Sequence, residues 1–127
     1  MTVVLDASAY LACLNGEPGA DAVEQTLPRA VMSTVNFSEV VAKLADKGLS
    51  EAEIGEVMSA MPVRELAPFD KEQAVSAGLL RRATRRAGLS LADRACLALA
   101  KACSAPALTA DRAWAGLDLG VRIEVIR

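Results

Sequence analysis

Histidine is absent from the 127-residue chain, and aromatic residues make up only 3% of it. The lack of histidine excludes Ser–His nucleophile pairs, imidazole acid–base catalysis and every zinc site that uses a histidine. The scarcity of aromatic residues leaves no stacking platform of the kind that single-strand nucleic-acid binders use. Any catalysis by this chain must therefore rest mainly on carboxylates.

Cysteines and long hydrophobic runs are also scarce. The three cysteines, Cys13, Cys96 and Cys103, form no C-x-x-C pair, and because each lies among Ala and Leu we expect all three in the core. No stretch approaches the roughly 20 apolar residues that a bilayer span needs. The segment Met1–Asp6 lacks the basic start and apolar length of a signal peptide, so we expect a cytoplasmic protein without membrane contact.

The overall composition is that of a globular domain. Hydrophobic residues make up 53% of the chain and charged residues 24%, and this length fits one domain over residues 1–127. The net charge is −2, so the molecule as a whole should not attract nucleic acid. A nucleic-acid substrate would need a local basic patch.

The hydrophobic pattern alternates between short strands and helices. We expect strands at 2–5, 30–34, 63–69, 107–109 and 121–126. Helices are expected after residue 6 and over 20–27, 36–48, 50–62, 70–87 and 90–103, with a helical turn near 114–117. Because parallel strands need crossover connections, this order predicts an α/β fold whose parallel sheet has helices on both faces.

Four acids take positions at which such a fold would gather them. Asp6 and Asp111 each follow an apolar strand by one or two residues, and Glu39 and Asp93 lie in the first turns of expected helices. In an open parallel sheet, sites form at the carboxyl ends of the strands, where helix amino termini also point. The four acids are therefore candidates for one pocket.

An alternative interpretation makes the same acids helix caps. Asp6 and Asp111 suit N-cap positions, and Glu39 and Asp93 suit the third position of capping boxes that begin at Asn36 and Ser90. Chemistry is favoured where the acid has apolar neighbours, as Asp6 and Asp111 do, because a charged carboxylate beside a core is costly unless it is paired or binds a cation.

Clustered carboxylates would repel one another until divalent cations neutralised them. Their oxygen ligands suit hard cations such as Mg²⁺ or Mn²⁺. Two such ions roughly 4 Å apart can activate water and stabilise a leaving oxygen, so phosphodiester hydrolysis needs no histidine. A chain without histidine can therefore still be a metal-dependent nuclease.

The segments around the four acids are LDASAYLA at Asp6, STVNFSEVVAKL at Glu39, GLSLADRACLALA at Asp93 and LTADRAW at Asp111. In this order and spacing they resemble PIN-domain ribonucleases, specifically VapC-type toxins, over nearly the whole chain. The resemblance implies a PIN-like three-layer α/β/α sandwich with a central, mainly parallel sheet flanked by helices. It also implies a single PIN domain over residues 1–127.

The resemblance further implies a metal-dependent endoribonuclease with these four acids as its catalytic quartet and Mg²⁺ or Mn²⁺ as its cofactor. We expect Asp6, Asp93 and Asp111 to ligate metal directly, whereas Glu39 ligates directly or through water, or orients the attacking water. It also implies a homodimer, and a cognate VapB-type antitoxin that inserts a segment into the acidic groove.

Three further residues match supporting positions of that site. Ser8 and Thr109 match small hydroxyl positions and would support a ligand or the substrate phosphate. Asn36 lies one helical turn before Glu39, so it either faces the pocket or serves as the N-cap.

Arginines provide the local positive charge. Arg81, Arg82, Arg85 and Arg86 form two i,i+4 pairs near the end of an expected helix, either as an RNA-binding strip or as a solvated helix end. The proposed RNA-binding set adds two arginines beside the acids, Arg94 and Arg112.

Three alternatives remain at the level of sequence. An aspartyl phosphotransfer enzyme would use Asp6 as nucleophile, yet Ser8 stands where a second Asp is wanted and Leu5 where an acidic pair is wanted. A non-catalytic interaction module would use the acids as caps and the Ala-rich helices as a dimer surface. A PIN-domain nuclease could also serve housekeeping RNA processing rather than act as a toxin.

Overall fold

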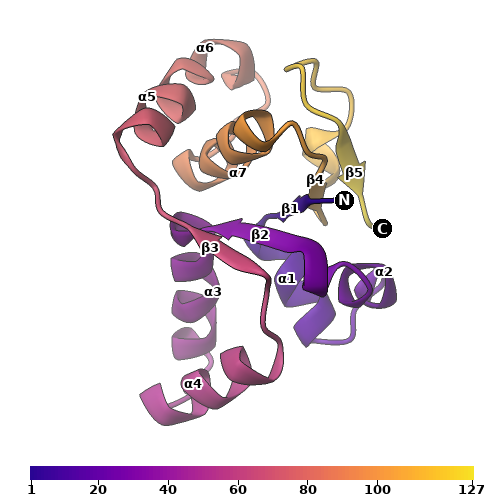
Figure 1. Cartoon of the computed structure of the whole chain (residues 1–127), viewed down its shortest axis with the longest axis vertical. Coiled ribbons are helices and arrows are strands. Elements are labelled where there is room, and N and C mark those ends of the chain that lie inside the picture. The colour runs from indigo at the N-terminus through magenta and orange to yellow at the C-terminus, as the bar shows by residue number, and fades with distance from the viewer.

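A five-stranded parallel sheet forms the centre of the molecule (Figure 1). The computed structural model describes residues 1–127, and the strand order is β3-β2-β1-β4-β5 with every neighbouring pair parallel. The strands are β1 (Val3–Leu5), β2 (Ala30–Ser33), β3 (Glu65–Ala67), β4 (Ala107–Thr109) and β5 (Ile123–Val125). Helical crossovers join them, so the expected α/β sandwich is confirmed.

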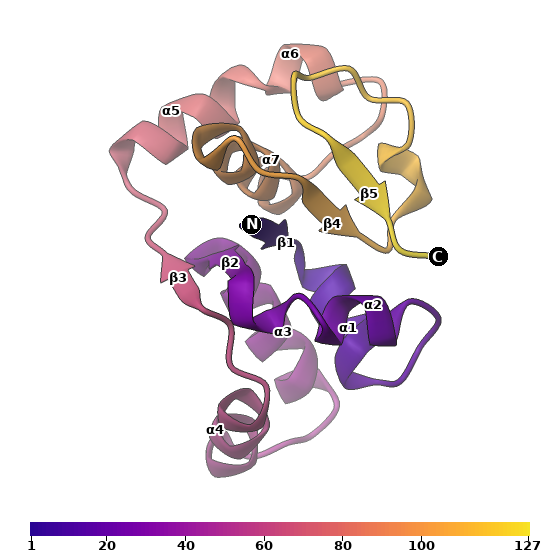
Figure 2. The ribbon, with the colours of Figure 1, turned by 45° about the vertical axis from the view of Figure 1, so that its right-hand side comes forward.

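The helices form two layers, one on each face of the sheet. The α-helices are α1 (Ala7–Leu14), α2 (Ala20–Glu24), α3 (Thr34–Asp46), α4 (Glu51–Ala60), α5 (Lys71–Leu79), α6 (Arg81–Thr84) and α7 (Leu91–Cys103). Two short 3₁₀ turns are η1 (Leu27–Arg29) and η2 (Arg112–Trp114). In Figures 1 and 2, α5, α6 and α7 lie on one side of the sheet, and α1, α2 and α3 lie on the other.

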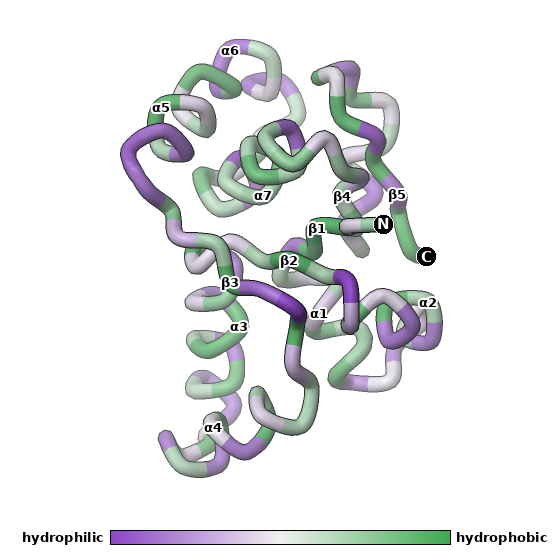
Figure 3. The backbone as a smooth tube through the Cα atoms, in the orientation of Figure 1, coloured by the Kyte–Doolittle hydropathy of each residue, from purple (hydrophilic) through white to green (hydrophobic).

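Alternation along the strands builds two hydrophobic cores. Val4 and Val31 pack on the side of α7, whereas Leu5 and Met32 pack with Tyr10 on the side of α1 and α3. This is the period of two that a strand imposes on its side chains. Figure 3 shows the central strands β1 and β2 largely hydrophobic, whereas the segment entering the edge strand β3 is hydrophilic.

Helix α3 begins earlier than expected. Ser33 is its N-cap and accepts a hydrogen bond from the backbone N–H of Val35, so the helix starts at Thr34. Asn36 is therefore the third residue of the helix, and the prediction that it is an N-cap is wrong. The cause is Ser33, a hydroxyl residue at the end of β2, which caps the helix three residues before Asn36.

The single helix expected over 70–87 is two helices, α5 and α6. Leu80 joins them with φ −67° and ψ −13°, which is tighter than α-helical geometry. In the last turn of α5, the carbonyl of Ala77 accepts a hydrogen bond from the Arg94 guanidinium on α7. A long-range side chain thus satisfies a carbonyl where the helix ends, and no local pattern shows this.

The expectation that all three cysteines are core residues is partly wrong. Cys96 is buried, Cys13 is half-buried, and Cys103 is exposed because it is the last residue of α7. Trp114 is fully buried and belongs to the core that includes the buried residues of α7. No helix has the length and apolar character required to cross a membrane.

Candidate functional site

The carboxyl edge of the sheet gathers the segments that carry the acids. Asp6 follows β1, caps α1 and is only 4% exposed. Helix α7 runs back across the sheet before β4, so its first turn, with Asp93, lies at this same edge. Asp111 follows β4 by two residues.

The Asp6 carboxylate is held by hydrogen bonds to both oxygens. Its Oδ1 accepts from the hydroxyl of Ser8 at 2.7 Å and from the backbone N–H of Ala9 at 2.9 Å. Its Oδ2 accepts from the hydroxyl of Thr109 at 2.8 Å. Both hydroxyl protons are thus donated to Asp6, which favours the ionised carboxylate.

Thr109 connects Asp6 with the segment that carries Asp111. Its Oγ1 accepts a hydrogen bond from the backbone N–H of Asp111 at 3.0 Å while its hydroxyl donates to Asp6. Ser8 makes a parallel link, because its Oγ accepts from the backbone N–H of Ala110 at 2.9 Å. The two hydroxyl residues therefore lock the end of β4 to the Asp6 carboxylate.

Glu39 and Asp93 approach from helices on opposite faces of the sheet, and both are half-buried. The Asn36 amide donates to Glu39 Oε1 at 3.3 Å and to the carbonyl of Ala92 at 3.0 Å. Since Ala92 directly precedes Asp93, Asn36 links the two acid-bearing helices. Lys43, which lies one turn beyond Glu39 on α3 and whose charge acts to lower the pKa of Glu39, was not predicted from the sequence. The i,i+4 spacing of the two residues is the signal that could have found it.

Burial and mutual repulsion raise the pKa of two of these carboxyls. Burial raises the pKa of Asp6 to about 6 despite the bonds from Ala9, Ser8 and Thr109, and the charge of Asp93 adds to the increase. Burial also raises the pKa of Glu39, again with a contribution from Asp93, while Asn36 and Lys43 oppose the increase. No salt bridge involves any of the four acids.

Beneath them, the buried thiol of Cys96 has a pKa well above its ordinary range. Its burial is the main cause, and the charges of Asp6, Asp93 and Glu39 contribute. The charges of Asp6, Asp93 and Glu39 thus all act on the same buried thiol. Asp111 exerts no such effect on these groups and is exposed.

The capping interpretation is correct for three of the acids. Asp6 and Asp111 are N-caps, and Asp93 forms a capping box with Ser90. It is wrong for Glu39, which is the sixth residue of α3. Each aspartate thus points at least one oxygen at its own helix start.

In these rotamers no group of three acidic or cysteine side chains is close enough to hold one metal ion. Each carboxylate nevertheless has an oxygen that accepts at most one hydrogen bond. Oδ2 of Asp6 accepts one, from Thr109. Oδ1 of Asp93, Oδ2 of Asp111 and Oε2 of Glu39 accept none. The buried Oδ1 of Asn36 also has no partner. An all-oxygen donor set with excess negative charge fits a hard divalent cation.

The arginine strip is exposed, whereas one predicted RNA-contacting arginine is not. Arg81 and Arg82 lie on α6 and Arg85 and Arg86 on the turn after it, and none forms a salt bridge. The prediction for Arg94 is wrong, because it is only 8% exposed and its guanidinium donates to the carbonyl of Ala77 at 2.9 Å.

Arg112, the other arginine expected beside the acids, lies at the surface. It is exposed at the start of η2, directly after Asp111. Its Nε donates to the carbonyl of Arg127 at 3.4 Å. The guanidinium is thus bonded to the backbone of Arg127, and no salt bridge joins it to Asp111.

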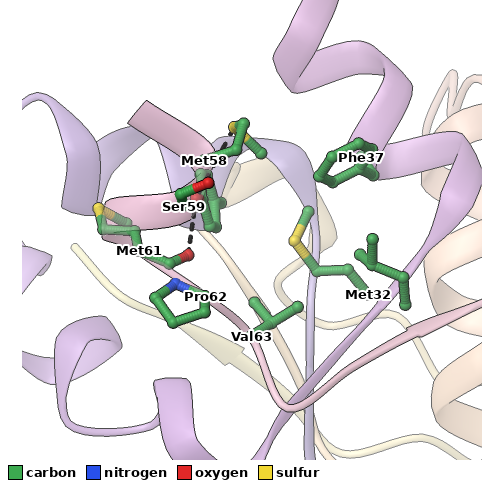
Figure 4. Close-up of a pocket in the computed structure, with 9 residues that line it drawn as sticks. Met32, Phe37, Met58, Ser59, Met61, Pro62 and Val63 are labelled. Atoms are coloured by element: carbon green, nitrogen blue, oxygen red, sulfur yellow. Dashed lines mark hydrogen bonds between the residues drawn. The ribbon is translucent and has the colours of Figure 1, made fainter. Parts of the chain in front are cut away.

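A separate apolar pocket of about 250 Å³ lies between α4 and the sheet (Figure 4). Met32, Phe37, Met58, Met61 and Val63 are among its lining residues, and no acidic or basic side chain lines it. The Tyr10 hydroxyl donates to the carbonyl of Met61 at 2.9 Å across it. The pocket has no charged side chain in its lining, and none of the four acids contributes to it.

The chain belongs to the PIN domain family, whose pattern it matches over residues 3–118. Its fold also matches solved structures of low sequence identity. A chain of a toxin-antitoxin complex from Klebsiella pneumoniae has a TM-score of 0.77 at 18% identity, covering 99% of this chain and 98% of that one.

Two further solved structures match over nearly the whole of both chains. A chain of DNA-bound VapBC from Salmonella typhimurium has a TM-score of 0.73 at 19% identity, covering 98% of this chain and 97% of that one. A chain of VapBC-5 from Mycobacterium tuberculosis has a TM-score of 0.63 at 22% identity, covering 100% and 99%. A search of curated proteins finds no match.

Proposed function

We propose that this PIN domain is a metal-dependent endoribonuclease of the VapC type, the toxin of a type II toxin-antitoxin pair. The observation that carries the proposal is the Asp6 carboxylate, which is almost fully buried, bonded at both oxygens and near Asp93, yet has no cationic partner. A buried charge of this kind is retained where a cation completes the site. The toxin-antitoxin descriptions of the structural relatives support the biological role.

The residues proposed to hold Mg²⁺ or Mn²⁺ are Asp6, Asp93 and Asp111, with Glu39 as a further ligand or as the group that orients the attacking water. When bound, such an ion supplies electrophilic assistance to phosphodiester hydrolysis. Ser8 and Thr109 fix the Asp6 oxygens by hydrogen bonds. Oδ1 of Asp93 and Oδ2 of Asp111, which accept no hydrogen bond, would be the atoms available to the ion, while the other oxygen of each aspartate makes its capping bond.

Cleavage of RNA by the purified protein is the direct test. We expect cleavage with Mg²⁺ or Mn²⁺, none with EDTA, and none by Asp6→Asn with either metal. An exposed aspartate, Asp118, gives the matched control Asp118→Asn, which should retain full activity. Cleavage that persists in EDTA, or an active Asp6→Asn protein, would contradict the proposal.

The exposed strip of Arg81, Arg82, Arg85 and Arg86 is proposed to contact RNA phosphates, with Arg112 beside Asp111. These arginines have no carboxylate partner, and only four residues separate Arg86 from the start of α7. Planar guanidinium groups match phosphate geometry. The strip thus supplies the positive charge that the chain as a whole lacks.

Replacing Arg82 and Arg86 together with alanine should flatten the salt dependence of RNA binding. Two lost phosphate contacts on single-stranded RNA correspond to a slope smaller by about 1.4 in log K against log salt. Binding is measured by fluorescence anisotropy in the inactive Asp6→Asn background. The pair Arg29→Ala and Arg122→Ala, exposed arginines outside the strip, serves as control. An unchanged slope in the strip variant would reject this role.

We also propose a VapB-type antitoxin and a second copy of this chain as protein partners, acting in the cytoplasm. The antitoxin follows from the VapBC descriptions of the structural relatives. Val75 and Leu79 on α5 are 54% and 71% exposed, which offers apolar surface for association with another protein.

A second candidate is a non-catalytic interaction module. It is favoured by one observation, the caps that Asp6, Asp93 and Asp111 make to their own helices. This candidate expects the same melting temperature in Mn²⁺ and in EDTA, whereas the nuclease expects stabilisation by Mn²⁺.

A further inference from the structure

The Asn36 side chain occupies an unusual place between the two helices that bring Glu39 and Asp93 to the site. It is 1% exposed and belongs to α3, one turn before Glu39. Its Nδ2 donates to Glu39 Oε1 at 3.3 Å and to the carbonyl of Ala92, on α7, at 3.0 Å. This second bond is the only side-chain hydrogen bond between α3 and α7.

The orientation of this amide follows from its neighbours. Both groups next to Nδ2 are acceptors, so turning the amide over would set Oδ1 against a carboxylate oxygen and a carbonyl oxygen. Each of the two amide protons therefore has one acceptor. Oδ1 remains buried without a donor, so packing alone does not explain why a polar side chain occupies this position. An apolar residue of this size would fill the space without an unpaired acceptor.

The two bonds relate the acids to each other geometrically. Helices α3 and α7 cover opposite faces of the sheet, and no backbone ladder joins them. The Asn36 amide donates one hydrogen bond to the Glu39 carboxylate and one to the carbonyl of Ala92, the residue before Asp93. It therefore sets where the Glu39 carboxylate lies relative to Asp93.

We propose that Asn36 is a positioning residue that orients Glu39 relative to Asp93 at the cation site, by clamping α3 to α7. This inference rests on the proposed nuclease function and extends it from the acids to the amide that places them. Asn36 acts through Glu39 and contacts neither the substrate nor the reacting atoms.

The test compares Asn36→Leu with the wild-type chain, because leucine keeps the branched shape of the side chain but removes both donors. We expect kcat for Mn²⁺-dependent RNA cleavage to fall about 10- to 100-fold, as for other groups that orient metal ligands. We also expect KM to change little and Mn²⁺ affinity, measured by calorimetry, to fall about tenfold. The other asparagine of the chain, the exposed Asn15, gives the control Asn15→Leu, which should bind Mn²⁺ and cleave RNA as the wild type does.

A double-mutant cycle with Glu39→Gln separates positioning from a structural role. If Asn36 acts through Glu39, Asn36→Leu should cause little further loss of Mn²⁺ affinity in the Glu39→Gln background. Equal losses in both backgrounds, or wild-type kcat and affinity in Asn36→Leu, would overturn the inference alone. A wild-type chain that neither binds Mn²⁺ nor cleaves RNA would overturn the proposed function and this inference with it. Should Asn36→Leu fail to fold, Asn36→Ser, which is too short to reach both acceptors, is read in the same way.

Discussion

Replacing Asp6 with asparagine is expected to stabilise the metal-free protein at pH 7.5. Burial raises the pKa of Asp6 in the folded state to about 6, against an ordinary value of 3.8. The folded state therefore binds the proton more tightly than the unfolded state does. Asp6 favours folding fully below pH 3.8, and this contribution is lost as the pH rises through 6. The shift corresponds to about 3 kcal/mol, an upper limit for what a neutral residue of the same shape recovers.

Urea unfolding in EDTA between pH 4 and pH 8 measures this effect. The stability of the wild type should fall relative to Asp6→Asn between about pH 4 and pH 6 and then stay lower. The two proteins should be nearly equally stable at the acidic end, and Asp118→Asn should follow the wild type throughout. An asparagine variant less stable than the wild type at pH 7.5 would contradict the burial of an unpaired charge at this site.

The Asp6→Asn protein should also lose more than about 100-fold in the rate of metal-dependent cleavage, since partners that merely orient a metal ligand already cost about 10- to 100-fold. Higher stability together with lost activity is the pattern expected where a site retains unfavourable charge for a bound cation. A residue needed only as a helix cap would show neither the gain in stability nor the loss of activity.

Replacing Thr109 with valine is expected to lower the cleavage rate about 10- to 100-fold while the chain still folds. Valine has nearly the same shape but removes the hydroxyl that donates to Asp6 Oδ2 and accepts from the N–H of Asp111. Because the lost bond favours the ionised carboxylate, the pKa of Asp6 should rise further above 6. The acidic limb of the rate against pH should therefore move to higher pH.

Initial cleavage rates in Mn²⁺ across pH 5 to 9 test this prediction, with Thr109→Ser as the control that restores a hydroxyl. Serine should recover most of the rate and the wild-type pH profile. If the serine and valine variants are equally slow, the hydroxyl has no part in holding Asp6. If the valine variant matches the wild type, Thr109 serves only to pack β4.

The places of Asp6, Asp93 and Asp111 in the fold could be predicted because they depend on local pattern and topology, whereas the expected place of Glu39 in a capping box was wrong. Asp6 and Asp111 follow strands, and Asp93 opens a helix with Ser90, so a parallel sheet brings their segments to one edge. The order of short apolar strands and amphipathic helices likewise determined the α/β class. These features need only the period of the sequence and the rule that parallel strands require crossovers.

The errors concern side chains whose partners lie far away in the sequence. Arg94 is next to Asp93 and was expected at the surface, but it turns toward α5, whose last carbonyls attract a cation. Asn36 has the spacing of a cap, yet Ser33 caps the helix instead and Asn36 bonds to a residue 56 positions away. Neither choice is visible in a local window, because it depends on how the helices pack.

The location of a bound ion tests the central claim most directly. Crystals grown with Mn²⁺ and measured at wavelengths where manganese scatters anomalously would show where the ion lies. We predict an anomalous peak at the carboxyl edge of the sheet, in contact with Oδ2 of Asp6 and an oxygen of Asp93, and no such peak in Asp6→Asn crystals. A wild-type map without a peak at this edge, with all three aspartates still capping their helices, would contradict the account.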